Sequence, residues 1–214
     1  MKAPPNIGSN LTLRERKKAE TRAKVLKIAH LLFDANSFDG TTLDEICSQS
    51  MISKRTFFRY FRDKEALVFP HRETRIETFV TFLETHQDAE NPFEVLRMAT
   101  KVFGGQYNEN KERIRNKQLL VRSSEALLAR EREIDQAWEQ QITLAFSRRS
   151  GGGPYNDLWA QVLAGAIMGV VRATMRYWFE GGCQDDLTQI GLDALDCLER
   201  GFPAPFGDAM PREN

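Results

Sequence analysis

The sequence has little of the chemistry that metal centres and disulfide frameworks require. Its 214 residues include three cysteines, Cys47, Cys183 and Cys197, which lie far apart and form no CxxC pair. Scattered cysteines in odd number support neither a disulfide framework nor a zinc site, and they suit a reducing cytoplasm. The three histidines are also scattered, without an HExxH spacing. We therefore expect no metal and no cofactor.

Long hydrophobic runs are also missing. The longest apolar stretch, Leu158 to Val171, has 14 residues and includes a glutamine, whereas a membrane-spanning helix needs about 20. The start, MKAPPNIGSNLTLRERKK, lacks the apolar centre of a signal peptide. These absences predict a cytoplasmic protein with no membrane partner, in which residues 158–171 form a buried or interface helix.

Net charge is zero, but the charges are unevenly distributed. Residues 1–75 contain 15 Lys and Arg against 9 Asp and Glu, whereas residues 76–214 contain 15 against 21. A basic module joined to an acidic one favours a polyanionic partner for the first module. Chance clustering of charges is the alternative.

Proline is scarce enough to leave room for long helices. None occurs between Pro5 and Pro70 or between Pro92 and Pro154, and proline is excluded from helix interiors. The apolar periodicity is helical throughout. We expect helices over residues 13–36, 43–48, 54–62, 65–85, 92–103, 111–130, 131–148, 157–179 and 187–201.

The fold class is therefore expected to be all-α, with about nine helices. Thr42 and Glu45 have capping-box spacing, and Ser53 can begin a second short helix after a brief connection. Two short helices joined in this way are typical of a helix-turn-helix. We expect a disordered arm at 1–12, a three-helix DNA-binding domain at 13–70, and a larger helical bundle at 71–214 for ligand binding and dimerisation.

The stretch SKRTFFRYFRDKEAL carries cations and aromatic residues on opposite faces of a helix. At 100° per residue its basic residues and Phe58 share one arc of about 140°, and Phe57 and Phe61 lie on the other side. Anchored by these two rings, the basic face could enter a DNA major groove, where Lys and Arg reach guanine and Phe58 reaches a thymine methyl. The candidate DNA-contacting residues are Thr42, Ser53, Lys54, Arg55, Thr56, Phe58, Arg59, Tyr60 and Lys64. A solvated basic face without a DNA partner is the alternative.

The segment TTLDEICSQSMISKRTFFRYFRDKEALV resembles the DNA-binding motif of the TetR family of bacterial transcriptional regulators. With the preceding helix, the resemblance covers about residues 13–70. It implies a homodimer that binds a palindromic double-stranded DNA operator and whose carboxy-terminal domains bind a small-molecule effector. Met51 departs from the family pattern, which commonly has glycine in the turn. A left-handed methionine there would cost about 1 kcal/mol.

The carboxy-terminal half offers a dimerisation surface and an effector site. Ala166, Gly169 and Ala173 lie on one stripe of the helix expected at 157–179 and would let a second helix approach closely, although simple core packing is the alternative. The resemblance implies an apolar cavity in this bundle for an apolar or amphipathic effector. Its candidate lining is Phe103, Tyr107, Arg122, Trp138 and Gln141. Arg122 could meet an anionic ligand or could simply be solvated.

These features favour a ligand-responsive transcriptional repressor. No nucleophile–base pair, catalytic carboxylate pair or glycine-rich phosphate loop is apparent, so we do not expect an enzyme. The alternatives are a helical small-molecule carrier, which would show no salt-dependent DNA affinity, and a nonspecific DNA-binding protein.

Overall fold

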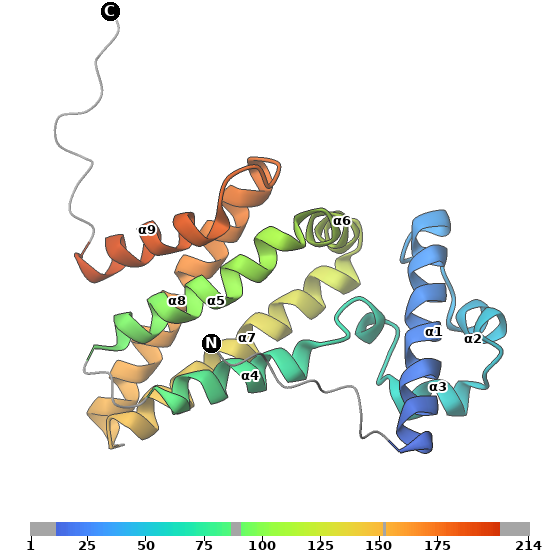
Figure 1. Cartoon of the computed structure of the whole chain (residues 1–214), viewed down its shortest axis with the longest axis horizontal. Coiled ribbons are helices and arrows are strands. Elements are labelled where there is room, and N and C mark those ends of the chain that lie inside the picture. The colour runs from blue at the N-terminus through green and yellow to red at the C-terminus, as the bar shows by residue number, and fades with distance from the viewer. Residues whose placement is uncertain (1–11, 87–90, 152, 202–214) are drawn as a thin grey trace, which may run out of the picture. The chain divides into compact units, whose positions relative to one another are not determined.

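The computed structural model describes residues 12–86, 91–151 and 153–201, and over these ranges the protein is all-α (Figure 1). Nine α-helices and one short 3-10 helix occur there, without a strand, which confirms the expected fold class. The helices are α1 (Leu13–Asn36), α2 (Leu43–Ser50), α3 (Lys54–Tyr60), η1 (Glu65–Leu67), α4 (Arg72–Thr85), α5 (Pro92–Glu109), α6 (Lys111–Arg122), α7 (Glu125–Arg149), α8 (Pro154–Glu180) and α9 (Leu187–Glu199). The expected arm at 1–12 lies outside the described residues except for Thr12.

Side-chain caps fix the starts of the short helices. The backbone N–H of Thr42 donates to the Glu45 carboxylate at 2.7 Å, and the Thr42 hydroxyl accepts from the Glu45 N–H at 3.2 Å. This reciprocal pair is the capping box expected for α2. Ser53 caps α3 by accepting from the Thr56 N–H at 3.1 Å.

The helix expected over residues 65–85 is divided in two. The Asp63 carboxylate accepts from the Ala66 N–H at 2.8 Å, but only the single turn of η1 follows, and its N-cap residue is Lys64. Pro70 follows, and α4 begins at Arg72. A proline is unsuited to a helix interior because it lacks the backbone donor, so the chain restarts the helix after it.

Two other expected boundaries are wrong by more than one helical turn. α5 continues through Gly104 and Gly105 to Glu109, instead of ending at Phe103. The boundary expected between residues 130 and 131 lies at Ser123–Ser124, between α6 and α7. Gly104 and Gly105, which were expected to end a helix, lie inside α5. Ser123 and Ser124, which were expected inside a helix, separate α6 from α7.

The described chain divides into two compact units, residues 12–70 with 119–128, and residues 71–118 with 129–201. We call them the first and second units. The first unit contains α1 to η1 and also the corner where α6 ends and α7 begins. Both α6 and α7 consequently have residues in each unit.

One apolar core holds the first unit together. Phe57 of α3 and Val121 and Leu127 of the α6–α7 corner are fully buried in it. The corner is also tied by a polar contact, since the Ser124 hydroxyl donates to the Asp39 carboxylate at 2.8 Å. The other buried members are Val25, Ala29, Leu32, Phe33, Phe38, Ile46, Cys47, Phe61, Leu67 and Val68.

In the second unit, α5 and α9 pack closely because glycine faces threonine. A Cβ on Gly104 would lie 2.9 Å from Thr188 Oγ1 and 3.1 Å from its Cα, and a Cβ on Gly191 would lie 2.8 Å from Thr100 Cγ2. Arg97 adds a polar link, with Nη2 2.7 Å from the Asp196 carboxylate. Close backbone approach explains why glycines occur inside these helices.

α8 is long and apolar enough to cross a membrane, with 27 residues and a mean hydropathy of 1.4 over an 18-residue window. A single helix of this kind is weak support for a membrane span, because core helices share these properties. One face of α8 is packed in the second unit, where Ala160, Ile167 and Trp178 are buried.

Candidate nucleic-acid interface

The turn between α2 and α3 positions the candidate interface. Met51 ends α2 in the left-handed conformation, with φ 56° and ψ 45°, and its N–H points to the carbonyls of Cys47 and Ser48. Its side chain is 79% exposed. The expected geometry at this glycine-type position is therefore kept by a methionine, whose backbone strain is on the order of 1 kcal/mol.

The two faces of α3 separate as expected. Phe57 and, just beyond the helix end, Phe61 are buried in the core of the first unit. Arg55, Phe58 and Arg59 are exposed on the opposite side. Arg55 has no protein partner among the described residues, and Phe58 is held edge-on against Phe57 with a centroid separation of 5.5 Å. The helix thus displays guanidinium and aromatic groups while its anchor side is packed.

Arg59 and Tyr60 form a pair on α3. The Arg59 guanidinium lies over the Tyr60 ring, 5.1 Å from its centroid, and Nη2 lies 3.4 Å from the phenol oxygen. Ser53 and Thr56 lie at the amino end of the same helix with their hydroxyl oxygens 3.0 Å apart. Four of the predicted contact residues are therefore held in place by neighbours within α3 or its cap.

Thr42 and Lys64 make contacts that stabilise the first unit itself. The Thr42 hydroxyl belongs to the capping box of α2. The Lys64 ammonium donates to the carbonyls of Phe38 and Thr41 at 2.9 and 2.8 Å and lies 4.1 Å from the centroid of the Phe38 ring. Lys64 thus braces the connection between α1 and α2, and one of its three N–H bonds remains for another acceptor.

An ion pair between α2 and α3 was not expected from the sequence. Lys54 Nζ lies 2.8 Å from Asp44 Oδ1. This hydrogen bond, more than the simple charge attraction, raises the pKa of Lys54. The sequence marks Asp44 only as an acidic residue in the first turn of a helix. The ion pair forms because the α2–α3 connection brings Lys54 of α3 beside Asp44.

Several aromatic candidates for an effector site are brought together in the second unit. Phe79 of α4 contacts both Phe103 of α5 and Trp138 of α7, with centroid separations of 5.7 and 5.3 Å. Phe82 also contacts Phe103 at 6.1 Å. An aromatic cluster of α4, α5 and α7 therefore includes two of the five predicted residues.

The other three candidates lie elsewhere. Tyr107 accepts a hydrogen bond from the Arg75 guanidinium, which lies over its ring at 5.0 Å. Gln141 lines a groove between α7 and α8. Arg122 is exposed and belongs to the first unit.

A cationic side chain missed by the sequence lies close to Arg75. Burial, and then the positive charge of Arg75, lower the pKa of Lys117 to about 8, partly offset by Glu131. Lys117 is half-buried, whereas lysines are mostly exposed, so this position stands out. Nothing in the periodicity of residues 111–130 marks Lys117 as different from its neighbours.

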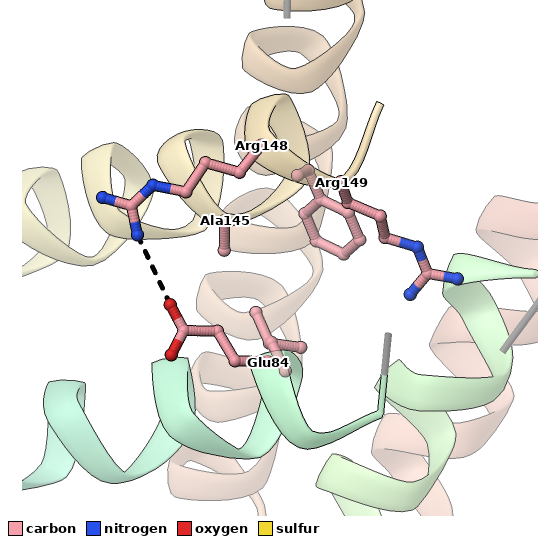
Figure 2. Close-up of a pocket in the computed structure, with 6 residues that line it drawn as sticks. Glu84, Ala145, Arg148 and Arg149 are labelled. Carbon is pink, nitrogen blue, oxygen red and sulfur yellow. Dashed lines mark hydrogen bonds and ion pairs between the residues drawn. The ribbon is translucent and has the colours of Figure 1, made fainter. Parts of the chain in front are cut away.

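The pockets lined by described residues of the second unit include two that are open and partly polar. Figure 2 shows the smaller, of about 80 Å³, where Glu84 of α4 faces Arg148 of α7 with Oε1 and Nη1 3.4 Å apart. The larger is the α7–α8 groove, of about 690 Å³, and most of its lining residues are polar or charged, including Asp135, Glu139 and Arg172. Burial raises the pKa of Asp135, and Arg172 opposes this rise.

α8 leaves an apolar stripe exposed, although Ala166 and Gly169 in its middle are half-buried. Tyr155, Leu158, Val162 and Tyr177 are 80%, 59%, 64% and 60% exposed. The small residues expected to allow close helix approach lie in the middle of this stripe. The single chain therefore provides no partner for this face of α8 among the described residues.

A capped pair of short helices with a basic, partly aromatic outer face, followed by a separate helical unit, defines a helix-turn-helix DNA-binding regulator. Comparison with known families identifies the group. Residues 25–69 match the family described as "Bacterial regulatory proteins, tetR family", and residues 90–203 match the "MftR C-terminal domain". The chain belongs to the TetR family of bacterial transcriptional regulators, which confirms the expected family and the expected class of non-enzymatic protein.

Individual relatives are distant but similar over nearly their whole length. TcmR, an HTH-type transcriptional regulator of Streptomyces glaucescens, is 25% identical over 92% of this chain and 89% of its own. MftR of Mycobacterium tuberculosis (strain ATCC 25618 / H37Rv), named for mycofactocin biosynthesis regulation, is 24% identical over 85% of this chain and 96% of its own. The crystal structure of Thermus thermophilus FadR with lauroyl-CoA has the same fold, with a TM-score of 0.54 and 22% identity over 89% of this chain and 99% of that one.

Proposed function

We propose that this TetR-family regulator is a cytoplasmic, ligand-responsive repressor that binds a palindromic operator as a homodimer. Its reading domain is residues 13–70, with residues 71–214 serving dimerisation and effector binding. The observation that carries the proposal is the display of Arg55, Phe58 and Arg59 on the outer face of α3, held by the buried Phe57. A helix of this width fits the major groove of B-DNA.

The proposed contacts divide by chemistry. Arg55 and Arg59 suit guanine acceptors, and Phe58 suits a thymine methyl group. Phosphate contacts, which fix register without reading sequence, fall to side chains at the edge of this surface. These are Thr42, Ser53, Thr56, Tyr60 and the remaining N–H of Lys64.

A second copy of the chain is the proposed occupant of the exposed α8 stripe. Bulky residues at its ends, Tyr155 and Tyr177, flank small residues at its centre, which suits an isologous helix pair. Two reading units on a two-fold axis would match a palindromic site whose half-sites are spaced by a helical turn or a multiple of it. Membership of the TetR family supports this assembly.

The proposed effector is amphipathic and anionic. The aromatic cluster around Phe79 offers an apolar surface, and the region of Arg75, Tyr107 and Lys117 in the same unit offers hydrogen-bond donors and positive charge. The lauroyl-CoA bound by Thermus thermophilus FadR combines an acyl chain with anionic groups. We extend that class of ligand, acyl thioesters or fatty acids, to this chain as a proposal.

Effector binding would act through α6 and α7, because each has residues in both units. A ligand that favours one arrangement of these helices in the second unit would also bias the Leu119–Leu128 corner in the first. Release from DNA requires that the two states differ in operator affinity by a few kcal/mol.

Gel-shift titration of the purified protein against its own upstream region tests the function. We expect saturation at protein concentrations at least 10³-fold lower than for unrelated duplex at the same salt concentration. Equal affinities would instead favour a nonspecific DNA-binding protein, and no salt-dependent DNA affinity would favour a carrier. An acyl thioester should release the operator complex, whereas a neutral amphiphile of the same chain length should not.

A further inference from the structure

Asp44 is an acidic residue in the first turn of α2 that the helix cap does not use. The N–H and hydroxyl of Thr42 both donate to Glu45, at 2.7 and 2.8 Å. The Asp44 carboxylate instead meets Lys54 Nζ across the turn at 2.8 Å. This places a negative charge beside the first cation of α3.

Folding gives little reason for this pair. The Asp44 and Lys54 side chains are 74% and 55% exposed, and exposed ion pairs contribute little to stability because water and salt screen them. Yet Asp44 lies next to the surface that displays Arg55, Phe58 and Arg59. The pair therefore has its main consequence where DNA would lie.

On DNA of unrelated sequence, the pair opposes binding. Lys54 has N–H bonds left for a phosphate, but the Asp44 carboxylate at 2.8 Å partly neutralises its charge and would itself lie near the phosphate backbone. A guanine–cytosine pair in the major groove is different, because the guanine O6 and N7 accept from lysine while the cytosine amino group donates to a carboxylate. Both members of the pair would then have partners.

We propose that Asp44 is a specificity-determining residue, which with Lys54 weakens binding to unrelated DNA and reads one G·C base pair of the operator. The proposal rests on the proposed binding of α3 in the major groove. In this proposal Asp44 discriminates between the operator and unrelated DNA, whereas Lys54, Arg55 and Arg59 supply most of the affinity for bases and phosphates.

The test uses the full-length protein, a duplex selected by the wild-type protein from a randomised pool, and an unrelated duplex of equal length. For Asp44→Asn we expect affinity for the unrelated duplex to rise about 3- to 10-fold, and the slope of log affinity against log salt to steepen by about 0.9. Affinity for the selected duplex should change less than threefold, so the specificity ratio falls. A selection repeated with Asp44→Asn should relax one G·C position.

Asp34→Asn is the matched control, since it removes one negative charge from an exposed position on α1 of the same unit. It should leave the specificity ratio unchanged. In a Lys54→Met background, Asp44→Asn should no longer change that ratio. Thermal unfolding followed by circular dichroism confirms that each variant is folded.

Three outcomes would overturn the proposal: equal gains by Asp44→Asn on both duplexes, the same gain from Asp34→Asn, or an undiminished effect without Lys54. An unchanged selected sequence would remove the base-reading role. Failure of the wild-type protein to select any preferred duplex would instead contradict operator binding itself, and that result is distinguishable from the others.

Discussion

The first unit gathers its buried apolar side chains in one core, although Met51 and Phe58 are exposed, whereas α8 of the second unit leaves a row of apolar side chains uncovered. Phe57, Val121 and Leu127 are fully buried in one core of the first unit. In the second unit, α5 and α9 are joined by glycine contacts and the Arg97–Asp196 pair, and the α8 stripe remains open. The first unit therefore has one shared core, and the proposed second copy of the chain would cover the open stripe of the second unit.

The sharpest way to break this comparison is to open the core of the first unit. Phe57→Ala should lower the free energy of unfolding by about 3–5 kcal/mol, because it removes a fully buried ring. Phe58→Ala is the matched control at the next position, 54% exposed, and should change stability by no more than about 0.5 kcal/mol. Urea unfolding followed by circular dichroism measures both.

Operator affinity also distinguishes Phe57→Ala from Phe58→Ala. Phe57→Ala should lose binding together with folding, whereas Phe58→Ala should weaken operator binding by about 1 kcal/mol or more while the protein stays folded. An unchanged operator affinity for Phe58→Ala would remove Phe58 from the reading surface.

The open stripe of the second unit is tested by charge. Val162→Glu should weaken dimerisation at least 100-fold, about 3 kcal/mol, because a carboxylate would be buried without a partner in the helix pair. Analytical ultracentrifugation measures the change, and operator affinity should fall with it. Val102→Glu places the same charge at an exposed valine of α5, and a protein that is equally dissociated by both substitutions would contradict the assignment of α8.

Two adjacent glycines in α5 test how closely α5 packs against α9 in the second unit. Gly104→Ala should destabilise the protein by about 1–3 kcal/mol, since the new methyl group would crowd Thr188. Gly105→Ala meets no atom within 4 Å and should stabilise it by about 0.5–1 kcal/mol through better helix propensity. Thermal unfolding of the two variants should shift in opposite directions, and equal shifts would show that α5 and α9 do not pack as described.

The smallest expected effect is a pH dependence of stability that arises from Lys117 in the second unit. The pKa of Lys117 is about 8 in the folded protein and near 10.5 when exposed, so the unfolded state holds the proton more tightly between these values. Stability from this group should therefore rise with pH from about 8 to 10.5, by on the order of 1 kcal/mol after solvent screening. Lys117→Met should flatten that rise and remove the cost at neutral pH, and parallel unfolding curves for the two proteins would contradict it.

Much of the first unit could be predicted from local sequence signals. Thr42 with Glu45, and Ser53 with Thr56, act over three residues, so a pattern of neighbours suffices to place α2 and α3. The opposed faces of α3 also follow from helical periodicity alone. The family resemblance added the left-handed turn at Met51, which the structure retains.

What the sequence did not predict depends on contacts between distant segments. Gly104 and Gly105 read as a helix end, but Gly104 serves a close approach to Thr188, 84 positions along the chain. Lys64 reads as a free cation, but the folded α1–α2 connection supplies two carbonyls for it. Both the Asp44–Lys54 pair and the aromatic cluster likewise require the packed helices before they exist.

The α6–α7 corner has a consequence for protein engineering. A DNA-binding domain cut from the chain after Pro70 would lack Val121, Leu127 and Ser124. Val121 and Leu127 are part of the core of the first unit, and Ser124 is hydrogen-bonded to Asp39. A chimera that joins this domain to the body of another regulator should therefore carry the ten-residue corner as well, inserted where the host turns between the corresponding helices. The first unit is formed by two separate segments of the chain, residues 12–70 and 119–128. Exchange of DNA-binding domains between relatives must therefore preserve both segments.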